Sequence, residues 1–512
     1  MNPPQSSHAH ASHDAHASPS VDVARASARA TRGASMRRGA PRSMLRAMRA
    51  RTARATRDAR ATTRRDGRRT TRDGAVAARR RDARGVATKA SASTWLWASE
   101  CYVRGPGVEG VDVERARATR ERVDAGRAAL SVAPMMEYTT PHFRVMARLM
   151  SRRVMLWTEM EVDQTVTHSA RDGDRVDKFL DYPAATFGTV LQLGGSTPEY
   201  LGRATAIAAP YGYDEINLNS GCPSPKVAGK GCFGAALMAE PGLVAECLAA
   251  MAENAPEGTP VSVKCRIGVD DVDSYDDLCD YVERIVAGSS TRRFYVHARK
   301  ALLAGLSPAE NRTVPPLKHE WAYALARDFP ECEFHLNGGL KTLNDVKNVL
   351  ERGPEDGGPI VGAMIGRQAH ADPWGLLSAA DTTLFGEASN PSASRRDFLN
   401  KYAVYADETI GRYGTAKDGY RIPSVRHMMH PIQNLFHGCA NNKAWRRLVE
   451  EDLQKRSKHP DTTVRSVLDA TLIAISDEDL DAPPIAAVGD AFDVNRAWEL
   501  PTRGGGFLAR TA

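Results

Sequence analysis

The stretch that decides the fold runs from Glu215 to Gly234 and reads EINLNSGCPSPKVAGKGCFG. Its first five residues alternate apolar and polar side chains, a pattern that predicts a β-strand. A tight turn follows and leaves the thiol of Cys222 at the carboxyl end of this strand, and the later glycines let the next loop approach a ligand closely. A cysteine in this place suits the catalytic group of a barrel enzyme. The alternative is a small residue that fills a turn.

Strand and helix patterns alternate on both sides of this stretch, over residues 128–385. The predicted strands are Ser131–Met136, Val154–Met160, Gly188–Leu193, Glu215–Asn219, Val261–Ile267, Phe294–His297, Glu333–Leu336 and Ile360–Ile365. The predicted helices are Pro141–Met150, Pro198–Ala209, Gly242–Asn254, Tyr275–Ala287, Glu320–Phe329 and Leu343–Leu350. This order and size are typical of an α/β protein with a (β/α)8 TIM barrel of about 250 residues. A doubly wound sheet is the alternative, but polar residues recur at the strand ends, which in a barrel converge on one face.

Only helical patterns follow the barrel. Residues 395–478 are predicted to form a small all-helical domain, with helices at Phe398–Gly411, Val425–Leu435, Lys443–Gln454 and Thr463–Ile475. Basic residues cluster in this domain, which indicates either a ligand surface or a solvated helix face. Residues 480–512 carry Pro-Pro and Gly-Gly-Gly and are predicted to be a flexible tail.

The first 94 residues differ from the rest in charge. They hold 21 Arg and one Lys against six Asp and no Glu, about +16, whereas the whole chain carries +7, so the remainder carries about −9. Arg-rich, Ser-rich and acid-poor N-termini are typical of transit peptides, so we expect import into a mitochondrion or chloroplast. The alternative is a disordered basic arm on a cytoplasmic protein. A nucleic-acid site on the acidic body must be a local patch.

The eight cysteines are scattered, with no CxxC pair and no histidine cluster at zinc spacing. We therefore expect a reducing compartment and no structural metal. No apolar run is long enough to span a membrane, so no membrane partner is expected.

Residues after the last two predicted strands suit a phosphate group. Asn337-Gly338-Gly339 and Gly366-Arg367 place glycine N–H groups and one arginine at the strand ends. Glycines that serve only packing are the alternative.

Residues at three other strand ends suit a flavin ring. Lys264 would place a cation at the N1/O2 edge of the ring, and Gln192 offers a donor and an acceptor to its pyrimidine. Met135 ends the first strand with a polarizable side chain that suits contact with the ring. A salt-bridged lysine and a polar residue that fills the barrel are the alternatives. Together, and in barrel order, these residues indicate FMN.

Residues 130–450 closely resemble the tRNA-dihydrouridine synthases, in particular their A-type branch. The matching pieces, in order, are SVAPMMEYTT, LWTEM, LQLGGS, GYDEINLNSGCPSPKV, VSVKCRIGVDD, HARKALLAGLSPAENR, FHLNGG and MIGR. The resemblance implies an FMN barrel with a helical tRNA-recognition domain. It implies reduction of D-loop uridines (20/20a) of tRNA to 5,6-dihydrouridine with NADPH. A monomer is expected.

The resemblance also implies a role for each matching residue. Cys222 is the general acid, and Asn219 lies beside the target uridine. The residues that line or hold FMN are Ala133, Pro134, Met135, Gln192, Lys264, His297, Asn337, Gly338, Gly339, Gly366 and Arg367. The expected tRNA contacts are Arg299, Arg312, Arg426, Lys443 and Arg446.

The chemistry of the reaction fits these roles. Saturation of the uracil C5–C6 bond needs a hydride at C6, from reduced FMN, and a proton at C5. A thiol with a pKa of about 8.5 is mostly protonated at neutral pH, so Cys222 can donate that proton. The base must be extruded from the folded tRNA, and binding should weaken with salt.

The chain departs from the family pattern in three places. Ala236 stands where the family has a second cysteine, and Cys232, four residues earlier, is interpreted as loop filler. Ala309 replaces a basic residue, so one tRNA contact is expected to be missing. Glu351–Gly358 is expected to be a surface insertion.

Two other functions are open to the sequence. The first is an FMN barrel oxidoreductase that acts on a free pyrimidine and is similar to dihydroorotate dehydrogenases, but a small substrate needs no basic helical domain. The second is a tRNA-binding protein without catalysis, against which the intact set of Gln192, Cys222, Lys264 and Arg367 argues.

Overall fold

The computed structural model describes residues 129–171, 176–181, 186, 188–230, 233–487, 489, 491–493 and 498–504. The chain divides into two units, Met1–Val76 and Ala77–Ala512, and every described residue belongs to the second. The predicted transit peptide over residues 1–94 and Cys232 therefore lie outside the described residues.

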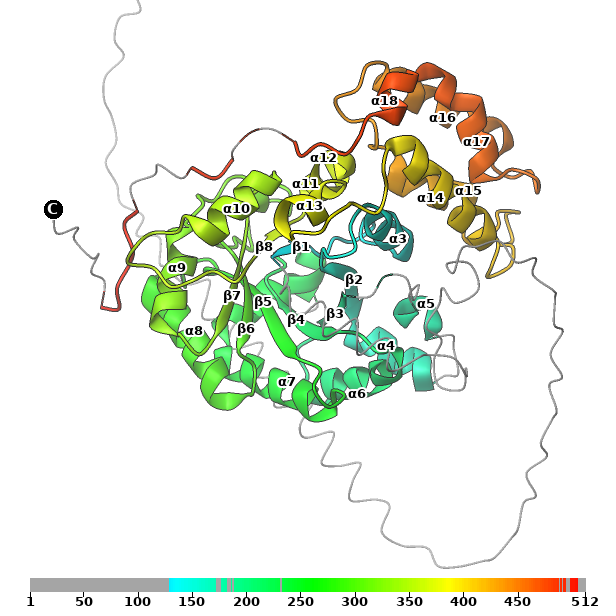
Figure 1. Ribbon diagram of the computed structural model, residues 1–512. Helices are drawn as coiled ribbons and strands as arrows, with labels where there is room; N and C mark the ends of the chain where they lie inside the picture. The colour runs from blue at the N-terminus through cyan, green and yellow to red at the C-terminus, as the bar shows by residue number, and fades with distance from the viewer. Residues whose placement is uncertain are drawn as a thin grey trace, which may run out of the picture. The chain divides into compact units, whose positions relative to one another are not determined.

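Within these residues, parallel strands form one eight-stranded sheet in the order β1-β8-β7-β6-β5-β4-β3-β2. Met155 joins its two edges, because Val132 N–H donates to Met155 O (2.9 Å) and Met155 N–H donates to Leu130 O (3.0 Å). The predicted (β/α)8 barrel is confirmed (Figure 1). The strands are β1 (Leu130–Val132), β2 (Leu156–Val162), β3 (Thr189–Gly194), β4 (Glu215–Ser220), β5 (Val261–Arg266), β6 (Arg293–His297), β7 (Glu333–Asn337) and β8 (Gly362–Ile365).

Helices connect the strands and surround the barrel (Figure 1). Their starts follow from the sequence, because Thr140 caps the first helix, and Ser274 with Asp277 and Thr342 with Asp345 form capping boxes. The connecting helices are α3 (Pro141–Met150), α4 (Asp163–Arg171), α5 (Asp177–Leu180), α6 (Pro198–Ala208), α7 (Pro241–Asn254), α8 (Tyr275–Gly288), α9 (Glu320–Asp328) and α10 (Leu343–Glu351), and β8 is followed by α11 (Arg367–Ala371), α12 (Pro373–Leu377) and α13 (Ala380–Leu384).

Four short helical turns also lie in the barrel. They are η2 (Ala209–Tyr211), η3 (Pro225–Lys230), η4 (Gly234–Ala239) and η5 (Glu310–Arg312). Of these, η3 is a π-helix and follows the Cys222 turn directly. π-Helical turns occur frequently at functional sites.

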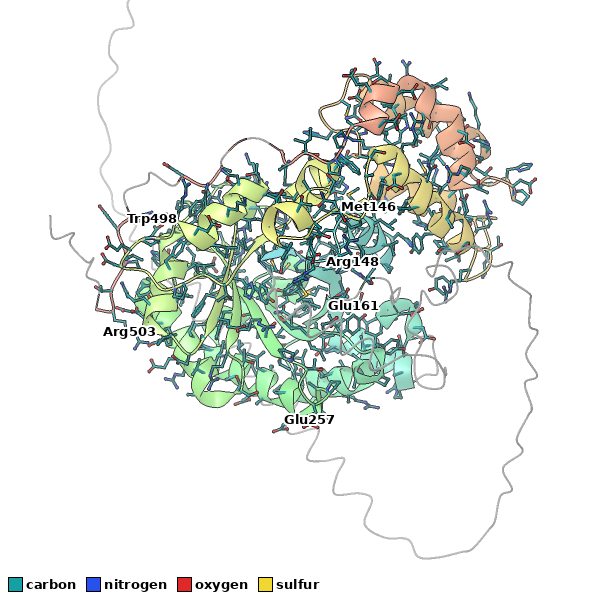
Figure 2. All side chains as sticks on the ribbon, viewed as in Figure 1. Met146, Arg148, Glu161, Glu257, Trp498 and Arg503 are labelled. Atoms are coloured by element: carbon teal, nitrogen blue, oxygen red, sulfur yellow. The ribbon has the colours of Figure 1, made fainter. Side chains whose placement is uncertain are left out.

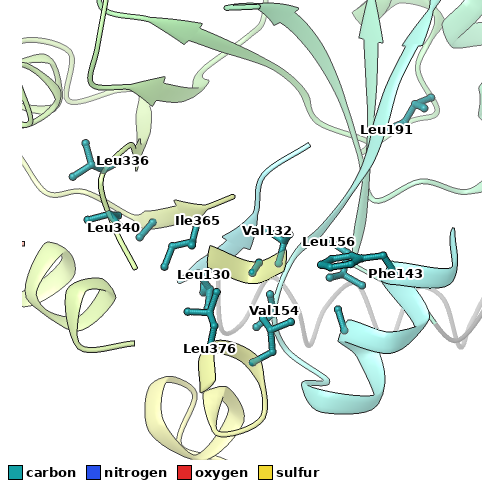
Figure 3. Packing of buried hydrophobic residues seen from close by; sticks show 14 of the residues in the cluster. Leu130, Val132, Phe143, Val154, Leu156, Leu191, Leu336, Leu340, Ile365 and Leu376 are labelled. Carbon is teal, nitrogen blue, oxygen red and sulfur yellow. The ribbon is translucent and has the colours of Figure 1, made fainter. Parts of the chain in front are cut away.

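Apolar side chains fill both sides of the barrel wall. Between strands and helices, Leu130 and Leu156 pack with Phe143 of α3 and Leu376 of α12 (Figure 3). Inside the barrel, a separate cluster contains Ala133, Met155, Trp157, Val190, Tyr295 and Met364. The Trp157 and Tyr295 rings meet edge to face, with centroids 4.6 Å apart. The interior of the barrel is therefore filled with side chains. A substrate can reach the barrel only at the face where the carboxyl ends of the strands lie.

Helices after residue 394 pack around Phe398, Tyr402, Phe436 and Trp445, all fully buried, and these side chains are continuous with the apolar core of the barrel. They are α14 (Arg395–Thr409), α15 (Val425–Met429), η6 (His430–Ile432), α16 (Asn442–Arg456), α17 (Val464–Thr471), η7 (Leu472–Ala474) and α18 (Asp477–Asp481). This region contacts the barrel through α3, where His142 Nδ1 lies 2.9 Å from Tyr405 Oη.

The described part of residues 482–504, which we call the strap, packs along the barrel helices. The N–H groups of Ala491 and Phe492 donate to Asp345 Oδ1 (2.6 and 2.8 Å), and Phe492 is fully buried. Trp498 lies against Tyr323 with ring centroids 5.4 Å apart, and Figure 2 shows Trp498 and Arg503 beside the barrel. These residues fall in the segment predicted to be a flexible tail, and in the structure large apolar side chains pack them against the barrel helices.

No helix among the described residues is long and apolar enough to cross a bilayer.

Candidate active site

The Cys222 turn follows β4 and is fixed on every side. Gly221 and Cys222 donate their N–H groups to Asn219 Oδ1 (3.1 and 3.0 Å), and Arg266 Nε donates to Gly221 O (3.0 Å). Ala235 N–H donates to Cys222 O (2.9 Å). The thiol is free and partly exposed. The chain thus holds one accessible thiol in a rigid place at the mouth of the barrel.

A glycine is required behind this cysteine. Gly234 has a φ of 65°, and a Cβ there would lie 2.7 Å from Cys222 O. Only glycine adopts this conformation without strain and leaves the turn its place. Gly234, the last glycine of the opening stretch, therefore serves the cysteine turn.

A chain of buried hydrogen bonds runs from Asn219 down through the barrel. Asn219 Nδ2 donates to Gln192 Oε1 (2.9 Å), and Gln192 Nε2 donates to Asn217 Oδ1 (2.9 Å). Asn217 Nδ2 donates to Ser262 Oγ (2.7 Å), which donates to Glu215. Glu215 pairs with Arg293 at 2.5 Å. We call this chain the relay.

The relay fixes the direction of each amide. With Gln192 Nε2 as a donor, Asn217 must turn its oxygen toward Gln192, since the reverse orientation would oppose two NH2 groups. The amide of Asn219 is committed both to the cysteine turn and to Gln192. Asn219, which was predicted to lie beside the uridine, holds the Cys222 turn in place.

Lys264 lies next along the mouth, on β5, and its ammonium makes no hydrogen bond or ion pair with another described residue. Burial lowers the pKa of Lys264 to about 8, Arg266 adds to this, and Cys265 and Cys222 oppose it. Burial also lowers the pKa of Arg266 to about 10. Two cations therefore lie within electrostatic range of the Cys222 sulfur and lack a carboxylate partner.

His297 and the glycines after β7 form a further part of the mouth. Gly338 and Gly339 have φ values of 114° and 81°, and a Cβ on Gly338 would lie 3.4 Å from the His297 ring. His297 Nδ1 is buried without a hydrogen-bond partner among the described residues. Burial, with Arg266 and Lys264 nearby, lowers the pKa of His297 well below its ordinary value. The barrel mouth is therefore lined here by a neutral imidazole and by glycine backbone that no side chain covers.

The loop after β1 closes the ring of strand ends. A Cβ on Gly366, which follows β8, would lie 3.3 Å from the Ala133 Cβ and 3.5 Å from the Met135 sulfur. Pro134 and Met135 are half-buried. Asn337 donates its amide to Met364 O (2.7 Å), so its side chain joins β7 to β8. The predicted cofactor residues of the first, seventh and eighth strands therefore meet.

These residues fit FMN. An unpartnered ammonium, an unpartnered imidazole nitrogen and glycine backbone at two strand ends suit an anionic, hydrogen-bonding cofactor with a flat ring. Met135 supplies an apolar, polarizable contact. No cluster of metal-binding side chains occurs among the described residues.

Three arginines gather above these groups. Arg367 donates to Arg312 O (3.2 Å), and Arg299 donates to Pro315 O. Burial and the charge of Arg367 lower the pKa values of both Arg299 and Arg312. No ion pair between these arginines and a carboxylate occurs in the described chain. Uncompensated positive charge of this kind suits phosphate groups.

The predicted tRNA contacts of the helical region differ from one another. Arg426 forms a two-pronged ion pair with Glu450 (3.0 and 3.2 Å). Lys443 and Arg446 on α16 are exposed and pair with no described carboxylate. The structure therefore leaves two of these three cations open to a ligand.

Acidic residues near the carboxyl end of β2 were not foreseen from the sequence. Burial, with Glu159 nearby, raises the pKa of Glu161 to about 7, and Arg144 opposes this. Burial raises the pKa of Asp163 to about 6, and its Oδ2 is buried without a hydrogen-bond partner in the described chain. These acids show that this side of the mouth is poorly hydrated.

Arg266 is the main positioning residue that sequence reasoning missed. Its guanidinium donates to Gly221 O and to the carbonyls of Lys300 (3.1 Å) and Asn311 (2.9 Å), so it ties three loops together. A signal was present, because Ser262, Lys264 and Arg266 alternate along β5 and therefore point to one face.

Comparison with known proteins agrees with this geometry. A family model described as "Dihydrouridine synthase (Dus)" matches residues 131–472. The tRNA-dihydrouridine(20/20a) synthase of Vibrio vulnificus is 41% identical over 326 residues, 64% of this chain and 92% of the relative. The Synechocystis enzyme of the same name is 39% identical over 344 residues (67% and 95%), and that of Escherichia coli K12 is 39% identical over 325 residues (64% and 86%). The chain belongs to the dihydrouridine synthase family.

Proposed function

We propose that this chain reduces D-loop uridines (20/20a) of tRNA to 5,6-dihydrouridine, with bound FMN and with NADPH as reductant. The observation that carries the proposal is the fixed, accessible Cys222 thiol beside two uncompensated cations, Lys264 and Arg266, in a member of this family. The names of the relatives support the tRNA position.

FMN, when bound, supplies the hydride that reaches C6 of the uracil. Lys264, Gln192 and the glycines after β7 and β8 hold the cofactor, and Met135 contacts its ring. Cys222 donates its thiol proton to C5: the S–H bond breaks as a C5–H bond forms. Lys264 and Arg266 then stabilise the thiolate, because both lie within electrostatic range of the sulfur. The partly exposed sulfur regains a proton from solvent.

The relay and the mouth arginines prepare the site for these steps. The relay keeps the amides of Asn219 and Gln192 in one orientation without rearrangement. Arg299 and Arg312 attract the tRNA backbone, Arg367 remains at the phosphate end of FMN, and the extruded base then enters the mouth. The composition of residues 1–94 supports import into a mitochondrion or chloroplast, where the substrate would be organellar tRNA.

The test uses FMN-loaded enzyme, NADPH and tRNA transcripts that lack dihydrouridine. Mass spectrometry should locate dihydrouridine at positions 20/20a. Cys222→Ala should slow its formation at least about 100-fold, while NADPH still bleaches the flavin. Cys439→Ala, a half-buried cysteine of the helical region, is the matched control and should react normally. No product with any tRNA would overturn the function, and full activity of Cys222→Ala would overturn the acid assignment.

A further inference from the structure

The turn after β1 displays two large side chains to solvent. Met136 is 56% exposed and Tyr138 is 40% exposed. The turn itself is tightly made: Tyr138 and Thr139 donate their N–H groups to Met135 O (3.1 and 2.9 Å), and Met135 N–H donates to Thr139 Oγ1 (3.0 Å). The exposure therefore belongs to a defined conformation.

The same turn contains a costly backbone conformation. Glu137 has a φ of 68°, in the left-handed region, and Glu159 Oε1 accepts its N–H at 2.6 Å. A non-glycine residue in this conformation is strained, and such residues are typical of functional sites. The position of Tyr138 is thus maintained against local strain.

Tyr138 meets two histidines from distant parts of the chain. Its ring lies edge-on to His370 of α11, with centroids 4.2 Å apart. His430 of η6 lies 6.0 Å from Tyr138 at an interplanar angle of 30°, and 5.9 Å from His370. We call these three rings the platform. They join the barrel mouth to the helical region.

Two arginines lie near the platform. Arg312 lies within electrostatic range of both Tyr138 and Cys222. Arg446 lies within electrostatic range of His370. Burial, His430 and Arg446 lower the pKa of His370, so this imidazole is neutral at physiological pH and behaves as a flat, uncharged ring.

We propose that Tyr138, His370 and His430 form a stacking platform for a tRNA base adjacent to the extruded uridine. Extrusion of the uridine breaks its stacking with the neighbouring base, which then needs another surface. Aromatic and histidine rings provide that surface for unstacked RNA bases, and the nearby Arg312 and Arg446 suit the adjacent phosphates. The inference rests on the proposed function.

The competing explanation is that the rings only join the barrel to the helical region. Asn434 Nδ2 already donates to His370 O (2.9 Å) at this junction. A purely structural contact would change stability but not discriminate between tRNAs with and without the adjacent base. The experiment is built on that difference.

The first measurement is the Kd of FMN-loaded protein for tRNA, by fluorescence anisotropy. Tyr138→Ala should weaken binding roughly 10- to 100-fold, and Tyr138→Trp should stay within about threefold, because stacking tolerates any aromatic ring. Tyr200→Ala is the matched control, since Tyr200 of α6 meets His168 edge-on at 6.1 Å among the outer helices. It should bind tRNA normally.

The second measurement repeats the titration with tRNAs that carry an abasic nucleotide on one or the other side of the target uridine. One of these tRNAs should bind wild type and Tyr138→Ala equally. Normal binding by Tyr138→Ala, or an equal loss on every tRNA, would overturn the platform. Binding needs no turnover, so this outcome is distinct from a failure of the proposed function, which is absence of dihydrouridine with wild type.

Discussion

Basic residues occur in two regions of the molecule, and the two regions differ in how many of these residues form ion pairs with carboxylates. In the helical region Arg426 pairs with Glu450, Arg456 with Asp452, and Arg396 with Asp477 and Asp481. At the barrel mouth Lys264, Arg266, Arg299, Arg312 and Arg367 form no ion pair with a described carboxylate. The Arg426 and Arg396 pairs are also well exposed to solvent, whereas burial lowers the pKa of most of the mouth cations.

The difference shows that basic composition is a poor guide to an anion site. A paired, hydrated arginine gives little net attraction to a phosphate, since the nearby carboxylate cancels its charge. An unpaired and poorly hydrated cation carries a cost that a bound anion relieves. The helical region drew attention in the sequence by its basic cluster, yet ion pairs neutralise part of that charge, whereas none of the five mouth cations pairs with a described carboxylate.

The largest expected effect concerns Lys264. Lys264→Met should weaken FMN binding to the apoprotein roughly 30-fold, because a charge-assisted contact is lost. The protonated lysine is the active form, so wild-type affinity should hold below the pKa of about 8 and fall as the pH rises above it. Flavin fluorescence titrations from pH 6.5 to 9.5 measure both effects. Lys264→Arg is the control and should show no decline, whereas a flat wild-type profile would contradict the account.

The next effect compares the two regions directly. Arg312→Gln should weaken tRNA binding about tenfold at low salt and reduce the salt slope by about one, because a phosphate contact is removed. Arg426→Gln should change binding less than about twofold, since Glu450 already neutralises this arginine. Anisotropy titrations between 50 and 300 mM salt (about the usual working range) measure both. Equal losses in the two variants would break the comparison.

A smaller effect tests whether the mouth is poorly hydrated. Glu161 has a raised pKa of about 7, so between about pH 4.5 and 7 the folded protein holds more protons than the unfolded chain, and stability falls as the pH rises. Glu161→Gln removes the loss of stability above pH 4.5, because glutamine does not ionise. The variant should be more stable than wild type by about 1 kcal/mol at pH 8, with almost no difference near pH 4.5. Thermal melts at both pH values measure the difference, and an equal shift at both would refute the cause given.

The smallest expected effect comes from a variant that makes an arginine of the helical region unpaired, like the cations of the barrel mouth. Glu450→Gln releases Arg426 from its ion pair and should tighten tRNA binding about two- to threefold. Glu451→Gln is the control, because its partner Arg447 is held more loosely, at 3.6 Å, and is largely exposed already. Unchanged binding for Glu450→Gln would show that the surface around Arg426 does not touch tRNA.

Sequence patterns predicted the barrel well but misplaced its closure. The first strand was expected to reach Met136 but ends at Val132, because Thr139 draws the chain into a turn at Met135. The second was expected at Val154–Met160 and lies at Leu156–Val162. The apolar run at the start of this strand does not alternate between apolar and polar residues, so the sequence does not show where the strand begins. Its register against the first strand is set by the pairing of Met155 with Ser131. Helix α4 was missed because its DQTVTHSAR sequence is polar and rich in weak helix formers.

The candidate site was predictable where a single residue type performs the chemistry. Cys222, Lys264 and His297 stand at strand ends, and barrel topology alone brings them together. The relay was not predictable, because Asn217, Ser262 and Glu215 meet across two strands whose register no local pattern reveals. The platform was missed for the same reason, since its three rings come from three separate segments.

The strap changes the connectivity of the helical region. Residues after α18 return to the barrel, so this region is a loop held at both ends and not a terminal appendage. Residues 482–504 also lie beyond the part that the family model matches, which ends at residue 472. The chain connects the helical region to the barrel at both ends, before α14 and through the strap. These two connections limit how far the region can move, so its local concentration beside the mouth stays high even if a contact between the region and the barrel breaks. A carboxyl-terminal truncation that removes the strap would thus weaken tRNA binding without removing any tRNA contact, because the helical region would be tethered to the barrel at one end only.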